Sequence, residues 1–412
     1  MLWVAVIEST RFRGTTVKDS ADIHCYGRIP GGGDELLSEF VDRLFGGLPR
    51  VDQRNRSREY VTGLLVTPGK KTLRRMAAVV SDSPHASQAL QQFLNVSPWD
   101  WRPVRRALVE WAAERRPTLT WTLGLAVFPK RGDRSAGVHR RFVPGADRTL
   151  NCQLGIGLFL GSGDAFVPVD WRLVLPGRWQ CDEALRASVR IPSDEHTPSE
   201  GACALDLVRV QRAVTGRADI PLVVDLTQVP HDASFLAGLA GLGTGFVAQI
   251  PGSTLLHLPT GQGRSYTASQ LMSRAVDPAG SSVVPATGRR GHSRVCVRAV
   301  RLDLGDRPVP QRTYGLLVEH PTGENGGARY YVTDLTQYWP TDLLRLADNT
   351  RRAEEAVRDM RDHYGLLDFE GRSYPGWHHH MTLVSAAYAF RRLAGGRPQA
   401  GTPSVAAMAR AA

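Results

Sequence analysis

The stretch Ile220-Pro221-Leu222-Val223-Val224-Asp225-Leu226 decides the fold class of this chain. Its apolar residues are continuous rather than alternating, which is typical of a parallel strand that is buried on both faces of a sheet. Helical patterns lie on either side of it, at residues 201–215 and 233–242, and a further strand-like run follows at residues 246–250. Strands that alternate with helices in this way predict an α/β domain. Because the acid Asp225 lies near the end of this stretch, we expect the strand to deliver its carboxylate to the edge of the sheet.

Strand-like segments also precede this stretch, at residues 119–128, 152–160 and 167–175, with turn-forming residues between them. The texture changes at residues 251–310, which are rich in Gly, Pro, Ser and Arg and contain only short alternating stretches. This composition predicts a β-rich insertion or loops rather than a new core.

The sheet pattern resumes after this insertion. Residues 314–319 and 329–333 are typical of a strand pair, and residues 341–364 carry a helical stripe of apolar side chains. Residues 375–393 predict a last amphipathic helix. An Ala-, Gly- and Pro-rich tail follows, for which we predict disorder.

The N-terminal part of the chain has no strand pattern. Residues 1–33 show little periodicity and end in three glycines, which predicts a flexible leader and makes Asp34 the N-cap of a first helix. Helical spacing then extends to about residue 116. Residues 50–116 contain thirteen Lys or Arg against six Asp or Glu, so most of the positive charge lies in this helical module.

Part of this module allows two interpretations. Four basic residues begin a short helix, a turn at Ser81–Pro84 follows, and a second helix presents three glutamines. The pattern fits a helix-turn-helix, in which the second helix offers amide side chains to base edges. It fits equally a solvated basic face on a helical bundle. The residues concerned are Lys70, Lys71, Arg74 and Arg75, and then Gln88, Gln91 and Gln92.

Length and charge bound the class of protein. The chain has 412 residues, which exceeds what one core usually supports, so we expect two or more domains. Its net charge of +11 favours polyanion partners, nucleic acid first among them. Five widely spaced cysteines without a C-x-x-C pair indicate neither a disulfide framework nor a zinc site, which fits a cytoplasmic protein. Charged residues interrupt the short apolar opening, so neither export nor a membrane span is expected.

These patterns divide the chain into six parts. They are a flexible leader at 1–33, a helical DNA-binding domain at 34–116, the first part of a sheet domain at 117–250, the insertion at 251–310, the last part of the sheet domain at 311–395, and the tail at 396–412.

Several separated motifs resemble one known family. They are Gly365-Leu366-Leu367-Asp368-Phe369-Glu370-Gly371-Arg372-Ser373, Gly376-Trp377-His378-His379-His380, Phe128-Pro129-Lys130-Arg131-Gly132, Asn151-Cys152-Gln153 and Trp171-Arg172-Leu173-Val174-Leu175-Pro176. In this arrangement the chain resembles insertion-sequence transposases of the DDE superfamily. The resemblance implies an RNase H-like catalytic domain, a mixed sheet flanked by helices, together with a helical N-terminal region that binds DNA.

The family's chemistry needs three carboxylates. Cutting and joining DNA is an in-line displacement at phosphorus, which two divalent metals stabilise, and Mg²⁺ or Mn²⁺ takes oxygen ligands. By resemblance, Asp225 is the second of these carboxylates and Glu354 is the third, on the helix before Gly365. From the residues alone, Asp225 also fits a helix cap or turn, and Glu354 fits an exposed helix with an intrahelical ion pair.

The first carboxylate is missing. The family has one or two aspartates just before the motif at Phe128, and here Gly124 and Leu125 occupy those positions, where neither can bind a metal. Asp133 lies beyond the strand, in a loop that contains glycine. Asp170 lies on another strand that leads toward the same edge, so it remains a candidate substitute.

The helix of Glu354 also carries cations. Arg358 and Arg361 follow Glu354 at i+4 and i+7, so one face presents an acid and then two groups able to contact phosphate oxygens. The neighbouring Glu355 is an alternative ligand, although it points about 100° away. The DNA-binding residues that we predict are Lys70, Lys71, Arg74, Arg75, Arg105, Arg106, Arg358 and Arg361.

Three consecutive histidines, His378, His379 and His380, suggest a metal tract at first sight. Successive helical residues point about 100° apart, so they cannot all ligate one ion. Helix packing or phosphate contact is the expected role.

Two functions remain open. The chain is either a transposase that cuts and joins transposon-end DNA, with Mg²⁺ or Mn²⁺ as cofactor, or a catalytically degenerate relative that binds DNA as a regulatory or architectural protein. The resemblance also implies a homodimer on double-stranded DNA, in the cytoplasm and associated with the nucleoid. A protein-interaction scaffold without DNA affinity is a third class.

Overall fold

The computed structural model describes most of the chain between residues 33 and 394. The described residues are 33–116, 120–143, 146–163, 165–196, 199–217, 219–227, 233–259, 264–273, 281–285, 292–302, 312–321 and 327–394. The predicted leader, except Gly33, and the predicted tail therefore lie outside the described residues.

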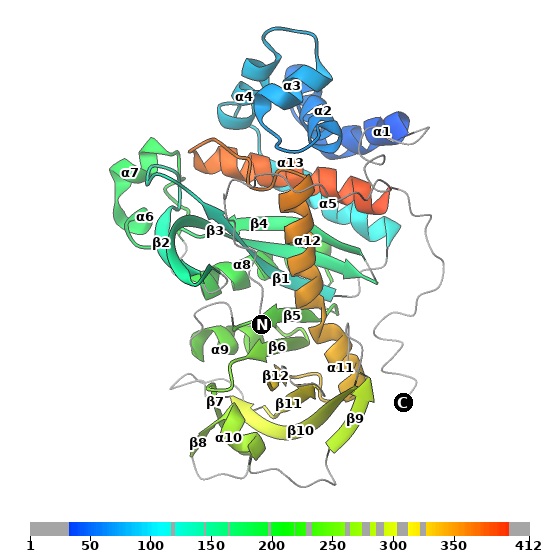
Figure 1. Cartoon of the computed structure of the whole chain (residues 1–412), viewed down its shortest axis with the longest axis vertical. Helices are drawn as coiled ribbons and strands as arrows, with labels where there is room; N and C mark the ends of the chain where they lie inside the picture. The colour runs from blue at the N-terminus through cyan, green and yellow to red at the C-terminus, as the bar shows by residue number, and fades with distance from the viewer. Residues whose placement is uncertain are drawn as a thin grey trace, which may run out of the picture.

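Five strands form the central sheet (Figure 1). In space their order is β4-β3-β1-β5-β6; β3 pairs antiparallel with both β4 and β1, whereas β5 pairs parallel with both β1 and β6. If these five strands are numbered 1 to 5 by their order in the sequence, their order across the sheet is 3-2-1-4-5. This is the arrangement of an RNase H-like sheet, so the predicted fold class is confirmed. The strands are β1 (Thr120–Pro129), β3 (Arg148–Ser162), β4 (Ala165–Leu173), β5 (Leu222–Asp225) and β6 (Phe246–Ile250).

The sheet does not end at β6. It continues through β12, β11, β10, β7 and β8, while β9 pairs with β10 and β2 pairs with β3 at the other edge. The predicted strand pair is confirmed, because β11 and β12 are antiparallel neighbours. The bounds are β2 (His139–Val143), β7 (Leu255–His257), β8 (Ser265–Thr267), β9 (Ser281–Pro285), β10 (His292–Leu302), β11 (Tyr314–Pro321) and β12 (Arg329–Thr333).

The segment predicted as an insertion contributes directly to the core. Leu256, Leu271 and Val300 belong to the same buried cluster as the strands of the central sheet. Its strands extend that sheet and bury apolar side chains, so the segment is more than surface loops.

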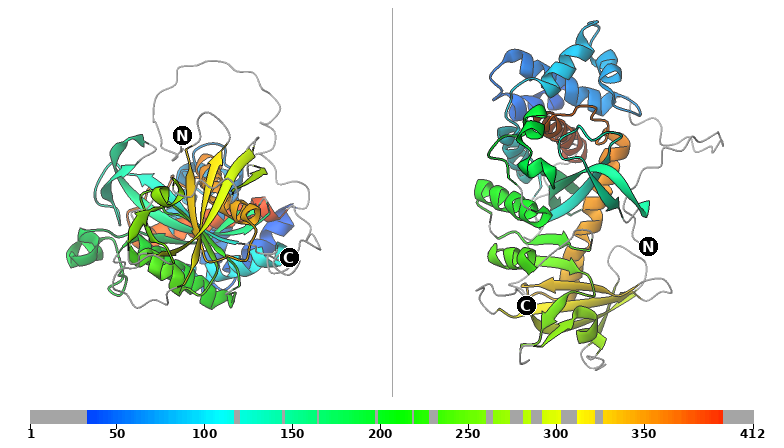
Figure 2. Two further views of the ribbon diagram at one scale, coloured as in Figure 1. Left: turned by 90° about the horizontal axis from the view of Figure 1, so that it is seen from below. Right: turned by 90° about the vertical axis from the view of Figure 1, so that its left-hand side faces the viewer.

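Helices cover both faces of the central sheet. Figure 2 shows α8 and α9 on one side and α12 on the other. The predicted helix at 341–364 is two helices, because the backbone turns at Asp348, whose carboxylate pairs with Arg351 and Arg352. The helices after β4 are α6 (Arg178–Cys181), α7 (Glu183–Ser188), α8 (Glu200–Thr215), α9 (Ala233–Gly241), α10 (Ala268–Ser273), α11 (Pro340–Ala347), α12 (Asn349–His363) and α13 (Tyr374–Leu393).

Local sequence fixes several helix ends. Ser199 caps α8 by accepting a hydrogen bond from the backbone N–H of Ala202, and Gly216 ends the helix in the left-handed region with φ +64°. The prediction that Asp34 is the N-cap of the first helix is wrong, because α1 begins at Gly33 and Asp34 lies in its first turn. An acid in that turn still favours the helix, because it faces the positive end of the helix dipole.

The N-terminal helices pack against the last helix of the chain. The all-helical prediction is confirmed by α1 (Gly33–Phe45), α2 (Val51–Val66), α3 (Leu73–Val80), α4 (Ala86–Asn95) and α5 (Trp101–Arg115). Helix α13 contacts α2, α4 and α5 on one side and β4 on the other, so it joins this module to the sheet. Among the described residues, no helix combines the length and apolar character that a membrane crossing requires.

Candidate functional site

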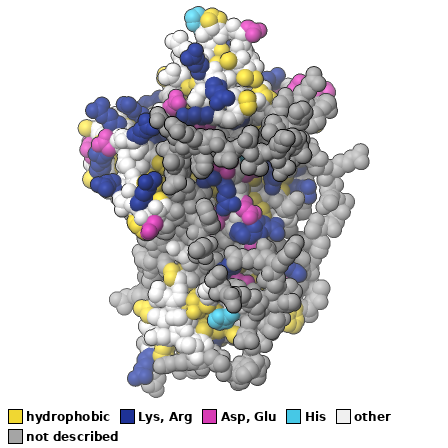
Figure 3. Space-filling model, viewed as in Figure 1, with side chains coloured by type: hydrophobic (Ala, Val, Ile, Leu, Met, Phe, Trp, Pro, Cys, Tyr) yellow, Lys and Arg dark blue, Asp and Glu magenta, His cyan; other side chains and the backbone are white. Residues whose placement is uncertain are grey.

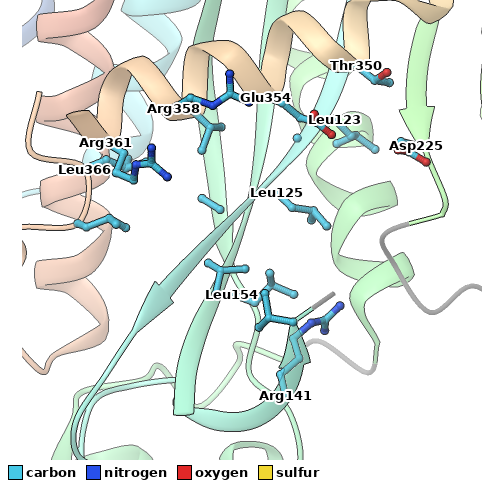
Figure 4. Close-up of a pocket in the computed structure, with 16 residues that line it drawn as sticks. Leu123, Leu125, Arg141, Leu154, Asp225, Thr350, Glu354, Arg358, Arg361 and Leu366 are labelled. Carbon is cyan, nitrogen blue, oxygen red and sulfur yellow. The ribbon is translucent and has the colours of Figure 1, made fainter. Parts of the chain in front are cut away.

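A cleft lies where α12 crosses the central sheet (Figure 4). Its volume is about 990 Å³, including space open to solvent, and its walls come from β1, β2, β3, the end of β5, α12 and the loop after α12. Helix α12 packs closely over β1: a Cβ built on Gly124 would lie only 3.5 Å from the Cβ of Ala353. This is an ordinary van der Waals distance, so α12 packs directly on β1, whereas the same Cβ would lie only 2.9 Å from the ring of Phe159.

Asp225 reaches the cleft as the last residue of β5. Its Oδ1 accepts hydrogen bonds from the backbone N–H of Thr227 at 2.8 Å and from Thr227 Oγ1 at 2.7 Å. Burial raises the pKa of this carboxyl, and the two hydrogen bonds from Thr227 oppose the rise. The carboxylate is thus oriented by the turn after its strand.

Glu354 enters the same cleft from α12. Burial, followed by the nearby charge of Asp225, raises the pKa of Glu354 to about 7, while Arg358 acts in the opposite direction. Two carboxylates that are 129 positions apart in the sequence therefore line the same cleft, near enough for the charge of Asp225 to act on Glu354. A pair of close acids in a partly buried site is an arrangement that favours either a shared proton or a cation.

Glu355 is not part of this cleft. Its side chain is exposed and pairs with Arg351, in a separate recess that Arg392 also lines. As expected from the angle between successive helical residues, the two acids serve different faces.

The position of the first carboxylate is apolar. Gly124 and Leu125 both line the cleft, together with further aliphatic residues of β1. Thr122 of β1 and Val223 of β5 are partners where these two strands pair in parallel. Gly124 and Asp225 each lie two residues further along their own strands. Among the residues that the structure describes, no three His, Cys, Asp or Glu side chains form a cluster that could hold a metal ion.

Asp170 does not replace the missing acid. It is buried, and its Oδ1 pairs with Arg105 Nη1 at 2.6 Å while its Oδ2 accepts a hydrogen bond from Gln211 at 2.8 Å. Asp133 instead lies 3.5 Å from an Arg178 nitrogen on the exposed loop after β1. Neither carboxylate lines the cleft.

The donor set therefore does not fit a pair of divalent metals. Two metals bridged at one site need carboxylate oxygens on both sides, and here one side is the aliphatic wall of β1. Asp225 of β5 and Glu354 of α12 are the only acids among the described residues that line the cleft.

Three arginines also line the cleft: Arg358, Arg361 and Arg141. Arg361 pairs with Asp362, and Arg141 of β2 pairs with Glu200 at the start of α8. The sequence pointed to Arg358 and Arg361 through their helical spacing. It could not point to Arg141, because only the pairing of β2 with β3 brings that strand to the cleft.

The predicted basic residues of the N-terminal module separate into two groups. Side chains of four residues are exposed and accessible to a partner: Lys70, Arg74, Arg75 and Arg106. Lys71 and Arg105 are buried, so the prediction that they contact DNA is wrong for both. Lys71 donates to the carbonyl of Thr67, and burial lowers its pKa to about 8.

The two helices of the possible helix-turn-helix are present as α3 and α4, and they pack on each other. Gln88, Gln91 and Gln92 are exposed on α4, while Leu90 and Phe93 are buried beneath them. In Figure 3, some Lys and Arg side chains lie over the N-terminal helices at the top, a denser group lies on the left flank over α6, α7 and β2, and others lie near the middle of the face shown. An amide-bearing helix face thus lies next to exposed basic residues.

The three consecutive histidines have separate structural partners. His378 Nδ1 lies 3.2 Å from Arg105, both ring nitrogens of His379 face backbone carbonyls, and His380 lies 3.0 Å from the hydroxyl of Tyr60. All three are buried in α13, away from the cleft. They pack the helix against the N-terminal module, one of the two roles that we expected.

The family of this chain follows from comparison with known proteins. The solved piggyBac transposase synaptic complex with hairpin DNA is similar to this chain, with a TM-score of 0.40 and 11% identity, over 89% of this chain and 75% of that one. A comparison with curated proteins gives no match. A family described as "DDE superfamily endonuclease" matches residues 43–293, which is more than half of the chain and includes Asp225 but not Glu354. The chain belongs to this family of DDE superfamily endonucleases.

Proposed function

We propose that this chain is a catalytically degenerate relative of the DDE transposases that binds double-stranded DNA as a regulatory or architectural protein. One observation carries the loss of catalysis. The cleft retains Asp225 and Glu354, but its β1 wall presents Gly124 and Leu125 where the resemblance calls for the first carboxylate. Among the described residues no third acid joins them, so the pair of metals that strand cleavage needs would lack its shared ligands there.

DNA binding rests on the distribution of charge. Arg74 and Arg75 are exposed at the start of α3, and the exposed amide side chains of α4 follow directly. Arginine side chains at such a surface contact phosphate oxygens and position the duplex, while amides on a neighbouring helix can contact base edges. Arg358 and Arg361 in the cleft offer a second contact region for phosphates.

Binding is tested with a labelled duplex that carries the sequence flanking the gene. Phosphate contacts release counterions, so affinity should fall steeply as salt rises. Replacing Arg74 and Arg75 by Gln should flatten the plot of log affinity against log salt by about one unit per lost contact. The control replaces Arg217 and Arg345 by Gln, because these exposed arginines lie outside the proposed surface.

Equal slopes for the two double variants would show that α3 is not a DNA contact. Affinity that does not respond to salt would contradict DNA binding itself and favour a protein-interaction scaffold. The same duplex, incubated with Mg²⁺ or Mn²⁺, should remain uncut.

A second function, metal-dependent cleavage and strand transfer at transposon ends, is favoured by the meeting of Asp225 and Glu354. It predicts strand cleavage that Asp225→Asn and Glu354→Gln each abolish. For either function, two copies on one DNA molecule are expected from the resemblance, and sedimentation of the complex measures that ratio.

A further inference from the structure

The wall of the cleft is unusual for a surface that handles only phosphates. Four aliphatic side chains that line it are partly exposed: Leu125 and Val127 of β1, Val357 of α12, and Leu367 of the following loop. Fully buried Leu154 and Leu366 lie behind them. Covering partly exposed aliphatic groups with an apolar ligand is favourable at about 25 cal/mol per Å². A DNA backbone, which is polar and charged, gains little from such a wall.

Charge is distributed along the length of the cleft. Glu354, Arg358 and Arg361 follow each other along α12, so the acid and the last arginine are about 10 Å apart along the helix axis. Figure 4 shows Glu354 near Asp225, Arg361 on the opposite side, and Leu125 between them. The cleft therefore has an acidic end, an aliphatic middle and a basic end.

Arg358 lies between Glu354 and Arg361 along α12 and adds a second cation next to the basic end. Within the described part of the chain it makes no hydrogen bond or ion pair that would occupy its guanidinium, whereas Arg361 pairs with Asp362. A guanidinium offers five donors in a planar fork that matches a carboxylate or sulfonate group. The acids at the opposite end repel a second negative group.

We infer that the cleft binds a small organic anion with one negative group and an apolar body about 10 Å long. The anionic group meets Arg358 and Arg361, and the body covers Leu125, Val127 and Val357. Molecules with negative groups at both ends are excluded by Asp225 and Glu354. This site lies apart from the α3 and α4 surface, and it shares only Arg358 and Arg361 with the proposed DNA contacts.

The probe for the experiment is 8-anilinonaphthalene-1-sulfonate, a monoanion with an apolar body of suitable size. Fluorescence titration of the full chain should show saturable binding, and equilibrium dialysis should give one molecule per chain. Arg361→Gln should weaken binding about tenfold, because a charge-assisted hydrogen bond is lost. Leu125→Asn, which keeps the number and branching of the side-chain heavy atoms but makes the group polar, should also weaken binding about tenfold.

Each variant has a matched control elsewhere. Arg392→Gln changes an arginine in the recess on the other side of α12, and Leu65→Asn changes a partly exposed leucine of α2. Both controls should bind the probe as wild type does. Circular dichroism confirms that all four variants are folded.

The inference fails if the cleft variants and the controls bind the probe equally, or if many probe molecules bind per chain. The titration is made without DNA, so its result is separate from that of the proposed function. Probe binding with no DNA affinity would refute only the DNA proposal, and DNA affinity without specific probe binding would refute only this one.

Discussion

Glu354 is the residue whose protonation most directly reports on the cleft. Its pKa of about 7 lies well above the ordinary value near 4.5, because burial and Asp225 both disfavour the charged form. A raised pKa in the folded state means that this contribution to stability is present below pH 4.5 and is lost as the pH rises through about 7. We expect Glu354→Gln to raise the free energy of unfolding by about 2 kcal/mol at pH 8, measured by urea denaturation in EDTA.

The same substitution should change stability little at pH 4, where the wild-type carboxyl is protonated in the folded chain. Glu355→Gln provides the neighbouring control, since that side chain is exposed and pairs with Arg351. An equal gain from Glu354→Gln at both pH values would contradict the raised pKa.

Gly124 is the residue at which the missing acid can be restored. A Cβ there would lie 2.9 Å from Cε2 of Phe159, so the ring must shift, and Gly124→Asp should cost about 1–3 kcal/mol of stability. The new carboxylate would stand near Asp225 and Glu354 and complete an oxygen donor set. We expect Mn²⁺ to raise the melting temperature of this variant in differential scanning fluorimetry, and to leave the wild type nearly unchanged.

Gly124→Asn separates charge from size. Its side chain has almost the same volume as that of aspartate, so the steric cost is similar, but it adds no carboxylate. If Mn²⁺ stabilised both variants alike, the third ligand would not be at this position.

At the scale of elements, α5 is held by one buried cation. Arg105 donates to Asp170 at 2.6 Å, to Thr382 Oγ1 at 2.8 Å and to the carbonyl of Trp171 at 2.8 Å, so it joins α5 to β4 and α13. Removing one partner of a buried ion pair leaves the other charge without compensation. We expect Arg105→Ala to lower the free energy of unfolding by about 3–5 kcal/mol, as measured by chemical denaturation.

Arg106 gives the comparison on the same helix. It is exposed, so Arg106→Ala should alter stability by no more than about 0.5 kcal/mol, and it should weaken DNA binding instead. Similar stability losses for the two variants would show that the buried network does not anchor α5.

At the scale of the whole molecule, one core joins parts that the sequence treats as separate. Buried side chains from Leu37 of α1 to Leu393 of α13 belong to one continuous apolar cluster. Helix α13 lies between the N-terminal helices and β4, so neither side keeps its buried surface if the other unfolds. We expect a single cooperative thermal transition, with tryptophan fluorescence and far-ultraviolet circular dichroism giving the same midpoint.

Tryptophans in both regions make this measurement informative. Trp111 is buried in α5 and Trp171 is buried in β4, so fluorescence follows the two regions together. Two resolved calorimetric transitions would show instead that the helical module is an independent domain.

The sequence by itself determined the fold class and the two acids of the cleft. A continuous apolar run is stable as a strand only when both of its faces are covered, and so residues 220–226 already required a sheet between helices. Asp225 and Glu354 could be proposed as the second and third carboxylates because the order of the motifs resembles that of the DDE transposases. The absence of the first carboxylate was also visible, because Gly124 and Leu125 cannot ligate a metal whatever the fold.

Only the tertiary structure decided which charged side chains are available. Lys71 precedes α3 and Arg105 lies within α5, and each stands next to an exposed basic residue, so burial alone removes them from the surface. Asp170 looked like a substitute acid until its pairing with Arg105 was seen. Arg141 reaches the cleft through strand pairing between distant residues. The burial and pairing of these side chains depend on contacts between residues that are distant in the sequence. Local periodicity determines which face of a helix or strand a residue lies on, but it does not determine what covers that face.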